Sequence, residues 1–129
     1  MVEKIDLHIH TSCSDGTINL INEGNSCFAG YDLIAITDHE NLFNPREFDF
    51  ANCKAKFIPG VEICCNYWGA YIEILGYDFE PENENLSDIV SYVRNQRILA
   101  MDTILKNNNV TDYHIAGNPE CNESRPFLA

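Results

Sequence analysis

The 129-residue sequence has few basic residues and no long apolar run. Only 8 Lys and Arg stand against 20 Asp and Glu, and the formal net charge of −12 argues against binding to extended duplex nucleic acid, whose phosphates such a surface repels. No apolar stretch approaches the roughly eighteen residues of a membrane span, so we expect no membrane association. The N-terminus lacks the basic and then apolar order of a signal peptide, and we expect a cytoplasmic protein.

The cysteines lack the spacing of a zinc knuckle. None of the six follows a C-x-x-C pattern, and Cys64 and Cys65 are adjacent, which suits neither a knuckle nor a mutual disulfide. The hydrophobic content of 45% is ordinary for a globular protein. The chain is therefore predicted to be one small domain, or part of a larger one, with a real core.

The most informative stretch is residues 6–17, DLHIHTSCSDGT. A strand is predicted for residues 4–10, where apolar and polar residues alternate, so that His8 and His10 share one face. The Ser-x-Asp-Gly turn that follows can bring Asp15 back over the same end of the strand. Neutral imidazole and carboxylate suit zinc, manganese or iron, and this pattern therefore predicts a metal site.

An ordinary alternative exists for the same stretch. His8 and His10 could lie on the surface of a half-buried edge strand, with Asp15 only forming the turn. Two histidines at this spacing, followed by an acidic turn in a chain with only four histidines, favour the metal site.

Helical and strand patterns alternate in the first third of the chain. A short helix is expected near residues 19–29, with Gly30 as its C-cap. The continuously apolar run at 32–37 is typical of a strand buried on both faces, as parallel strands are. It is followed by Asp38-His39-Glu40-Asn41, polar residues at the carboxyl end of a strand, where α/β folds place ligands.

Two further apolar segments each carry a lone carboxylate. Residues 57–63 are predicted to form a third strand that contains Glu62, and residues 71–77 a fourth that contains Glu73, with a turn and hairpin between them. A carboxylate inside an apolar strand is costly to bury unless it is paired or bound to a cation. The alternative is that Glu62 simply faces water.

A long helix is predicted for residues 86–106 because apolar residues recur there at helical spacing, with Asn85 as candidate N-cap. Arg94 and Arg97 lie one turn apart on it and are candidates for binding a substrate phosphate, although a solvated flank is the commoner position for such arginines. Residues 107–129 are rich in Asn and Pro and show no periodicity.

Three motifs occur in an order and spacing that resemble the polymerase and histidinol phosphatase (PHP) family. They are Asp6-Leu7-His8-Ile9-His10-Thr11 with Ser14-Asp15-Gly16-Thr17, then Ile36-Thr37-Asp38-His39, then Pro59-Gly60-Val61-Glu62-Ile63. The later Ile74-Leu75-Gly76-Tyr77 and the helix with two arginines are similar to the family's small metal-dependent phosphoesterases. That branch hydrolyses nucleoside bisphosphates or the 5′ ends of short RNA.

The resemblance implies the α/β fold class, as a partial, distorted (β/α)7 barrel of about four strands followed by the long helix of a helical insertion. Residues 1–129 would form a single domain, with 1–80 as the N-terminal barrel portion and 81–129 as the helical insertion portion and irregular tail. Two or three divalent ions (Mn, Zn or Fe) would be held at the C-terminal strand ends. The implied metal ligands are His8, His10, Asp15, His39, Glu62 and Glu73.

The implied function is a hydrolase acting on phosphoric ester bonds, in which a metal-activated water hydrolyses a phosphate monoester or nucleotide phosphate. No catalytic side chain is needed beyond the metal ligands. The implied substrate is small, a nucleotide or a short oligonucleotide.

The chain departs from the family pattern at several points. Glu73 and Phe127 stand where relatives have histidine. The family's last motif, an Asp-x-His, is expected beyond residue 129. Asp112-Tyr113-His114 has the same pattern but is a poor candidate for this last motif. The chain thus looks truncated. This leaves the alternative of a catalytically weak or inactive metal-binding domain that needs a partner or self-association to close a sheet edge. A purely structural acidic domain without metal is a third interpretation.

Overall fold

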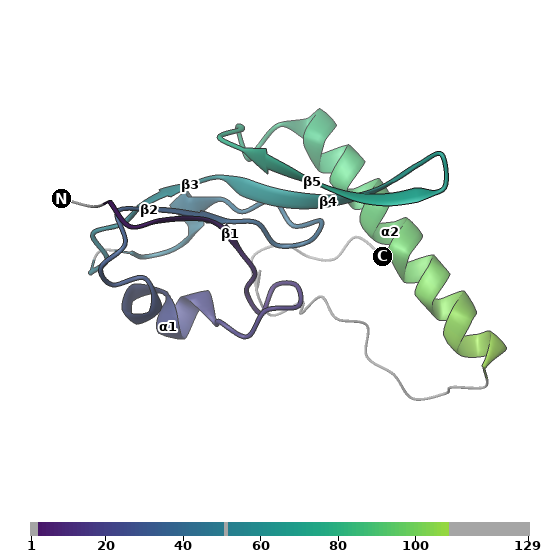
Figure 1. Ribbon diagram of the computed structural model, residues 1–129, viewed down its shortest axis with the longest axis horizontal. Helices are drawn as coiled ribbons and strands as arrows, with labels where there is room; N and C mark the ends of the chain where they lie inside the picture. Colours follow the sequence, from purple (N-terminus) through teal and green to yellow (C-terminus); the bar gives the residue numbers. More distant parts are fainter. Residues whose placement is uncertain (1–2, 51, 109–129) are drawn as a thin grey trace.

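The computed structural model describes residues 3–50 and 52–108, which form a mixed α/β structure with two sheets (Figure 1). In chain order the elements are β1 (Ile5–Ile9), α1 (Leu20–Cys27), β2 (Leu33–Ile36), the 3-10 helix η1 (Pro45–Glu47), β3 (Lys56–Ile58), β4 (Gly60–Tyr67), β5 (Ala70–Tyr77) and α2 (Glu84–Asn107).

The first sheet is parallel, with strand order β1-β2-β3. Helix α1 lies against one face of it (Figure 1), and its N-cap Asn19 accepts hydrogen bonds from the N–H groups of Ile21 and Asn22. The main core forms between this helix, the sheet and the segment after β2. Its buried members are Leu20, Phe28, Ile34, Ile36, Phe43 and Ala55. The strand predicted to be buried on both faces is β2, whose last three residues are fully buried.

The second sheet is the antiparallel hairpin β4-β5. The third predicted strand is in fact two strands, because the chain bends at Pro59 and changes pairing partner from β2 to β5, so the described residues hold five strands rather than about four. Gly60 is required at this bend, since a Cβ there would lie 2.3 Å from the carbonyl oxygen of Ile36. The hairpin turn at Trp68 and Gly69 has positive φ at both residues, as a type I′ turn needs.

Helix α2 crosses the hairpin and then extends beyond it (Figure 1). It begins two residues earlier than predicted, because the side chain of Asn83, rather than Asn85, accepts the hydrogen bond from the N–H of Leu86. The predicted apolar stripe is mostly uncovered within the described residues. Val90 is buried, while Ile89, Met101 and Ile104 are exposed. Within residues 3–50 and 52–108 no helix combines the length and the apolarity that crossing a bilayer needs.

Candidate metal centre

The two histidines of the first strand converge on one point. The register between β1 and β2 slips between Asp6 and Ile9, which indicates a β-bulge around His8. Bulges re-aim side chains, and here the Nε2 atoms of His8 and His10 lie 3.1 Å apart. The predicted shared face is therefore present, with both imidazoles turned toward the same neighbour.

That neighbour is Glu62, which is only 3% exposed. Its Oε2 atom lies 3.1 Å from Nε2 of His8, 2.9 Å from Nε2 of His10 and 3.8 Å from Nδ1 of His39. The alternative in which Glu62 faces water is wrong. A buried carboxylate among three imidazoles needs hydrogen bonds from the ring N–H groups or a bound cation.

The loop after β1 places Asp15 over the same imidazoles. Its Oδ1 atom lies 3.1 Å from Nδ1 of His10, and its Oδ2 atom lies 3.7 Å from Nε2 of His39. The loop returns tightly because the N–H of Gly16 donates to the carbonyl of Thr11 at 2.9 Å. A Cβ at Gly16 would come within 2.1 Å of the carbonyl oxygen of His10, so only glycine fits.

Asp38, which was not predicted as a site residue, holds this loop in place through hydrogen bonds. Its buried carboxylate accepts hydrogen bonds from the N–H and the hydroxyl of Thr11 and from the hydroxyl of Ser14, each at 2.6 Å. Ser14 in turn lies 3.3 Å from Nδ1 of His10. Asp38 therefore positions an imidazole without touching it.

His39 reaches the centre because the chain continues to pair after β2 has ended. His39 and Glu62 form an isolated parallel β-bridge. The N–H of Glu40 donates to the carbonyl of Glu62 at 2.9 Å, and the N–H of Glu62 donates to the carbonyl of Asp38 at 3.2 Å. The separately predicted motifs around residues 36–39 and 59–63 are thus joined through their backbones.

A further group of ligating atoms lies on the other side of His39. The Sγ atom of Cys64 is 3.9 Å from Nδ1 of His39 and 3.9 Å from Oε1 of Glu73. The hydroxyl of Tyr71 lies 2.9 Å from both Sγ of Cys64 and Oε1 of Glu73. Sequence reasoning missed Cys64, although a strand places residues 62 and 64 on one face.

Burial, opposed by the hydrogen bond to Tyr71 and reinforced by the hydrogen bond and charge of Glu40, raises the pKa of the Cys64 thiol to about 11. The hydrogen bonds to Cys64 and Glu73 likewise raise the pKa of Tyr71. Without a cation, both groups therefore stay protonated near neutral pH.

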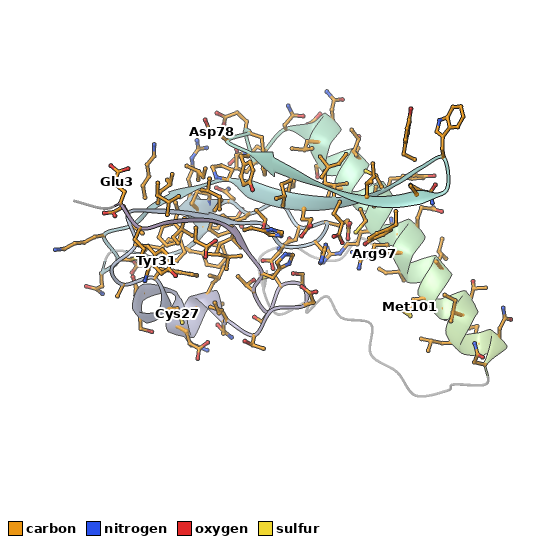
Figure 2. The ribbon with its side chains drawn as sticks, in the orientation of Figure 1. Glu3, Cys27, Tyr31, Asp78, Arg97 and Met101 are labelled. Carbon is orange, nitrogen blue, oxygen red and sulfur yellow. The ribbon has the colours of Figure 1, made fainter. Side chains whose placement is uncertain are left out.

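The two arginines of α2 occupy different positions. Arg97 lies where α2 crosses the hairpin (Figure 2), paired with the buried carboxylate of Glu40, and its Nη1 donates to Sγ of Cys64 at 3.5 Å. Desolvation lowers the pKa of Arg97, but the hydrogen bond and charge of Glu40 outweigh it and raise the pKa. Arg94 is partly buried one turn earlier. The phosphate-binding role of both stays a prediction.

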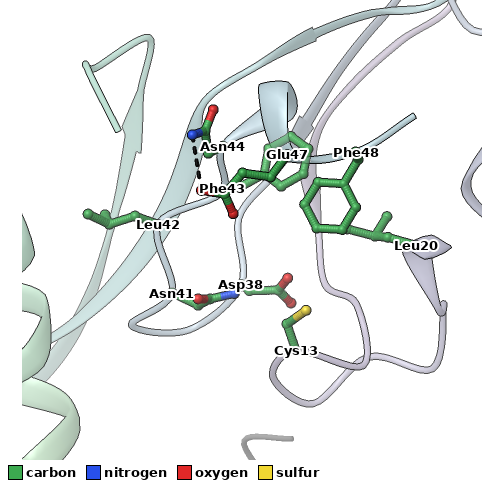
Figure 3. A pocket seen from close by; sticks show the side chains of 9 residues that line it. All are labelled: Cys13, Leu20, Asp38, Asn41, Leu42, Phe43, Asn44, Glu47 and Phe48. Atoms are coloured by element: carbon green, nitrogen blue, oxygen red, sulfur yellow. Dashed lines mark hydrogen bonds between the residues drawn. The ribbon is translucent and has the colours of Figure 1, made fainter. Parts of the chain in front are cut away.

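A small cavity lies beside Asp38, lined by residues that include Cys13, Phe43 and Asn44 (Figure 3). Its volume of about 10 Å³ is close to the minimum for one water molecule. This cavity is too small for a nucleotide, and none of the histidines lines it.

The separations among the ligand atoms fit a bound ion. An ion that binds its ligands at about 2.1 Å holds neighbouring ligand atoms about 3.0 Å apart in octahedral geometry and about 3.4 Å apart in tetrahedral geometry. The contacts among His8, His10 and Glu62, at 2.9 to 3.1 Å, match the first value. Three groups in the described chain have ligand atoms within 4.8 Å of one another: His8, His10 and Glu62; His10, Asp15 and His39; His39, Cys64 and Glu73. Together they include all six predicted metal ligands.

Known proteins resemble part of this structure. No protein-family model matches the sequence. A 5′-3′ exoribonuclease of Haemophilus influenzae is 29% identical over 93 residues, which are 70% of this chain and 34% of that protein.

Two solved structures share the fold. An amidohydrolase from Chromobacterium violaceum, with bound sulfate and no metal, has a TM-score of 0.59 and 26% identity over 73% of this chain and 34% of its own. A protein provisionally described as a metal-dependent phosphoesterase, from Bifidobacterium adolescentis, has a TM-score of 0.66 and 22% identity over 84% of this chain and 39% of its own. The chain thus spans little more than a third of each relative, and it shares the fold of that part.

Proposed function

We propose that this chain carries the metal centre of a hydrolase that cleaves phosphate monoesters of small substrates, such as a nucleotide or the 5′ end of a short oligonucleotide. We further propose that it is a PHP-type chain with part of the distorted barrel, and that the ion is manganese, zinc or iron. The order of the three motifs supports the family, and the relative described as an exoribonuclease supports a nucleotide substrate.

One observation carries the proposal. Glu62 is buried in the midst of three imidazoles, and its Oε2 atom lies 2.9 to 3.8 Å from a nitrogen of each. Burying a carboxylate costs free energy that hydrogen bonds from the imidazoles or a shared cation must offset. A divalent ion supplies that charge, and it also supplies Lewis-acid polarisation of a phosphoryl oxygen and a lowered pKa of water.

In this proposal the residues around the centre have different roles. His8, His10 and Glu62 would hold one ion, His39 would serve a neighbouring position, and Asp15 lies close enough to the rings of His10 and His39 to orient both. Asp38 keeps the loop and the His10 imidazole in place through Thr11 and Ser14. Arg97, at the edge of the centre, offers the guanidinium donors that fit phosphate oxygens, provided that its pairing with Glu40 leaves some of them available.

The test is an assay of the purified full chain, stripped with chelator and then supplied with Mn²⁺ or Zn²⁺. Hydrolysis of a nucleoside monophosphate and of a 5′-phosphorylated dinucleotide would be followed by phosphate release. We expect activity that requires the ion and is lost in His10→Ala. Glu84→Gln, a change of an exposed carboxylate in the first turn of α2, is the control and should keep full activity.

Turnover that persists in His10→Ala would overturn the proposal. Bound metal without turnover of either substrate would instead favour the inactive metal-binding domain. Measuring metal content beside activity separates these outcomes.

A further inference from the structure

We propose that His39, Cys64 and Glu73 form a second metal position with a thiolate ligand, beside the position of His8, His10 and Glu62. The proposal deepens the function above by assigning a new ligand and a metal preference. It rests on the proposed metal centre, but not on phosphoesterase activity.

The geometry of the three ligand atoms suits an ion with a sulfur ligand. Sγ of Cys64 lies 3.9 Å from Nδ1 of His39 and 3.9 Å from Oε1 of Glu73. A tetrahedral zinc ion with Zn–S of about 2.3 Å and Zn–N or Zn–O of about 2.1 Å holds sulfur and its neighbours about 3.6 Å apart. Both sulfur distances exceed this value by about 0.3 Å, and the three ligand atoms all lie within 4.8 Å of one another, so binding an ion would draw the imidazole and the carboxylate toward the sulfur.

The strands place these side chains reproducibly. Cys64 and Glu73 are directly opposite each other in the β4-β5 pairing, so their side chains share one face of the hairpin. Cys64 is also two residues from Glu62 and shares its face, while the thiol of Cys65 contacts the carbonyl of Ile63 at 3.8 Å. The chain thus offers Cys65 as a matched control, adjacent in sequence but on the other face.

His39 and Glu62 connect this position to the first one. Nδ1 of His39 faces Cys64, and its Nε2 faces Asp15 at 3.7 Å, an arrangement in which a carboxylate supports the far side of a metal-binding imidazole. Oε2 of Glu62 lies 3.8 Å from the same Nδ1 and 2.9 Å from Nε2 of His10. Glu62 therefore lies between the two positions.

A hydrogen-bonded cluster without metal is the competing explanation. The Tyr71 hydroxyl lies 2.9 Å from both Cys64 and Glu73, and Arg97 donates to the same sulfur. Tyr71 is largely exposed and can turn away, whereas the charge of Arg97 is balanced by Glu40. If Tyr71 organised the cluster, removing its hydroxyl would disrupt it; if metal does, Tyr71→Phe will leave metal binding intact.

The sulfur ligand predicts which ions are preferred. Thiolates favour zinc and cobalt over manganese, which prefers oxygen ligands. The second position should therefore select Zn²⁺ or Co²⁺ even where Mn²⁺ is in excess.

The test is Co²⁺ titration of the reduced, chelator-stripped full chain, followed by absorption spectroscopy and equilibrium dialysis. Wild type, Cys65→Ser and Tyr71→Phe should show the near-ultraviolet band of sulfur-to-cobalt charge transfer, and Cys64→Ser should lack it. Zinc affinity at this position should fall about tenfold or more in Cys64→Ser and stay unchanged in Cys65→Ser. X-ray absorption of the zinc-loaded wild type, which needs no variant, should show one sulfur at about 2.3 Å.

Bound Co²⁺ without the band in wild type, or a band that survives in Cys64→Ser, would overturn the thiolate position while leaving the proposed phosphoesterase intact. Failure to bind Co²⁺ or Zn²⁺ would overturn the thiolate position, and failure to bind Mn²⁺ and Fe²⁺ as well would overturn both proposals. A band with no phosphate release from any substrate would support the thiolate position and count against the proposed function alone.

Discussion

Glu40 and Arg97 form an ion pair that fastens helix α2 to the segment after β2. The other carboxylate oxygen of Glu40 accepts the backbone N–H of Cys64 at 2.8 Å, so one buried side chain holds both the helix and β4. Glu40 adopts a positive φ of 44°, which is uncommon for a residue other than glycine. Removing either partner of the Glu40–Arg97 pair should therefore lower the free energy of unfolding.

Replacing Arg97 with methionine should destabilise the fold, because it leaves the buried Glu40 carboxylate without its counter-charge. Arg97 is 48% exposed, so we expect a loss of about 2 kcal/mol rather than the larger cost of breaking a fully buried pair. Urea unfolding of Arg97→Met, Glu40→Gln and the double variant would measure it. The double variant should recover part of the loss, and strictly additive losses would contradict the coupling.

Asp38→Ala should be more damaging than its position outside the ligand set suggests. The change removes the acceptor of three short hydrogen bonds and leaves buried donors of Thr11 unsatisfied. We expect a loss of about 3 kcal/mol or more in the free energy of unfolding. Asp88→Ala, at an exposed position on α2, is a suitable comparison. A loss no larger than that of the comparison variant would show that Asp38 does not hold the loop.

Tyr77 should make stability depend on pH above neutrality. Burial, together with the negative charges of Glu62 and Asp6, raises the pKa of Tyr77. Because the folded pKa lies above that of the unfolded chain, the stabilisation is fully present below the ordinary tyrosine value of about 10 and is lost as pH rises through the folded value. The unfolding free energy of wild type should therefore fall more steeply at alkaline pH than that of Tyr77→Phe.

Tyr77→Phe should also reduce the stability of the fold near neutral pH. The Tyr77 hydroxyl donates to the carbonyl of Leu7 at 2.8 Å, and its removal should cost about 1 kcal/mol. Tyrosinate absorbance, compared between wild type and Tyr77→Phe during alkaline titration, checks the direction of the pKa. A Tyr77 that titrates at or below the usual tyrosine pKa would be inconsistent with a hydroxyl that is partly desolvated beside Glu62 and Asp6.

Divalent ions should raise the thermal stability of the chain. An ion at a hundred times its dissociation constant stabilises the native state by about 2.7 kcal/mol, or about 10 °C in Tm for a domain of this size. Addition of EDTA should reverse the shift. Glu62→Gln should lose the ion-dependent shift, whereas Glu84→Gln should retain it, and an equal shift in both variants would place the ion elsewhere.

Most helices and strands were predictable, because the spacing of apolar and polar residues along the chain specifies them. The alternation around His8 and the uninterrupted apolar run before Asp38 gave strands, and the hairpin containing Glu62 and Glu73 was confirmed. The boundary of α2 was missed by two residues because either asparagine could cap it. The split at Pro59 was missed because pairing with β2 and then β5 is decided by tertiary contacts.

The site was only partly predictable, because some of its contacts depend on tertiary structure. The proximity of Asp15 to His10 follows from a short turn, which the sequence displays. The contacts of Cys64 with His39 and Glu40 join segments more than twenty residues apart, and strand alternation alone predicts only that Cys64 shares a face with Glu62. The predictions for Phe127 and for Asp112-Tyr113-His114 lie outside the described residues.

The most direct test of the metal centre is anomalous diffraction from crystals of the full chain grown with Zn²⁺ or Mn²⁺. The account predicts a peak within bonding distance of Nε2 of His8, Nε2 of His10 and Oε2 of Glu62. The absence of a peak there, with these side chains still in contact, would contradict it.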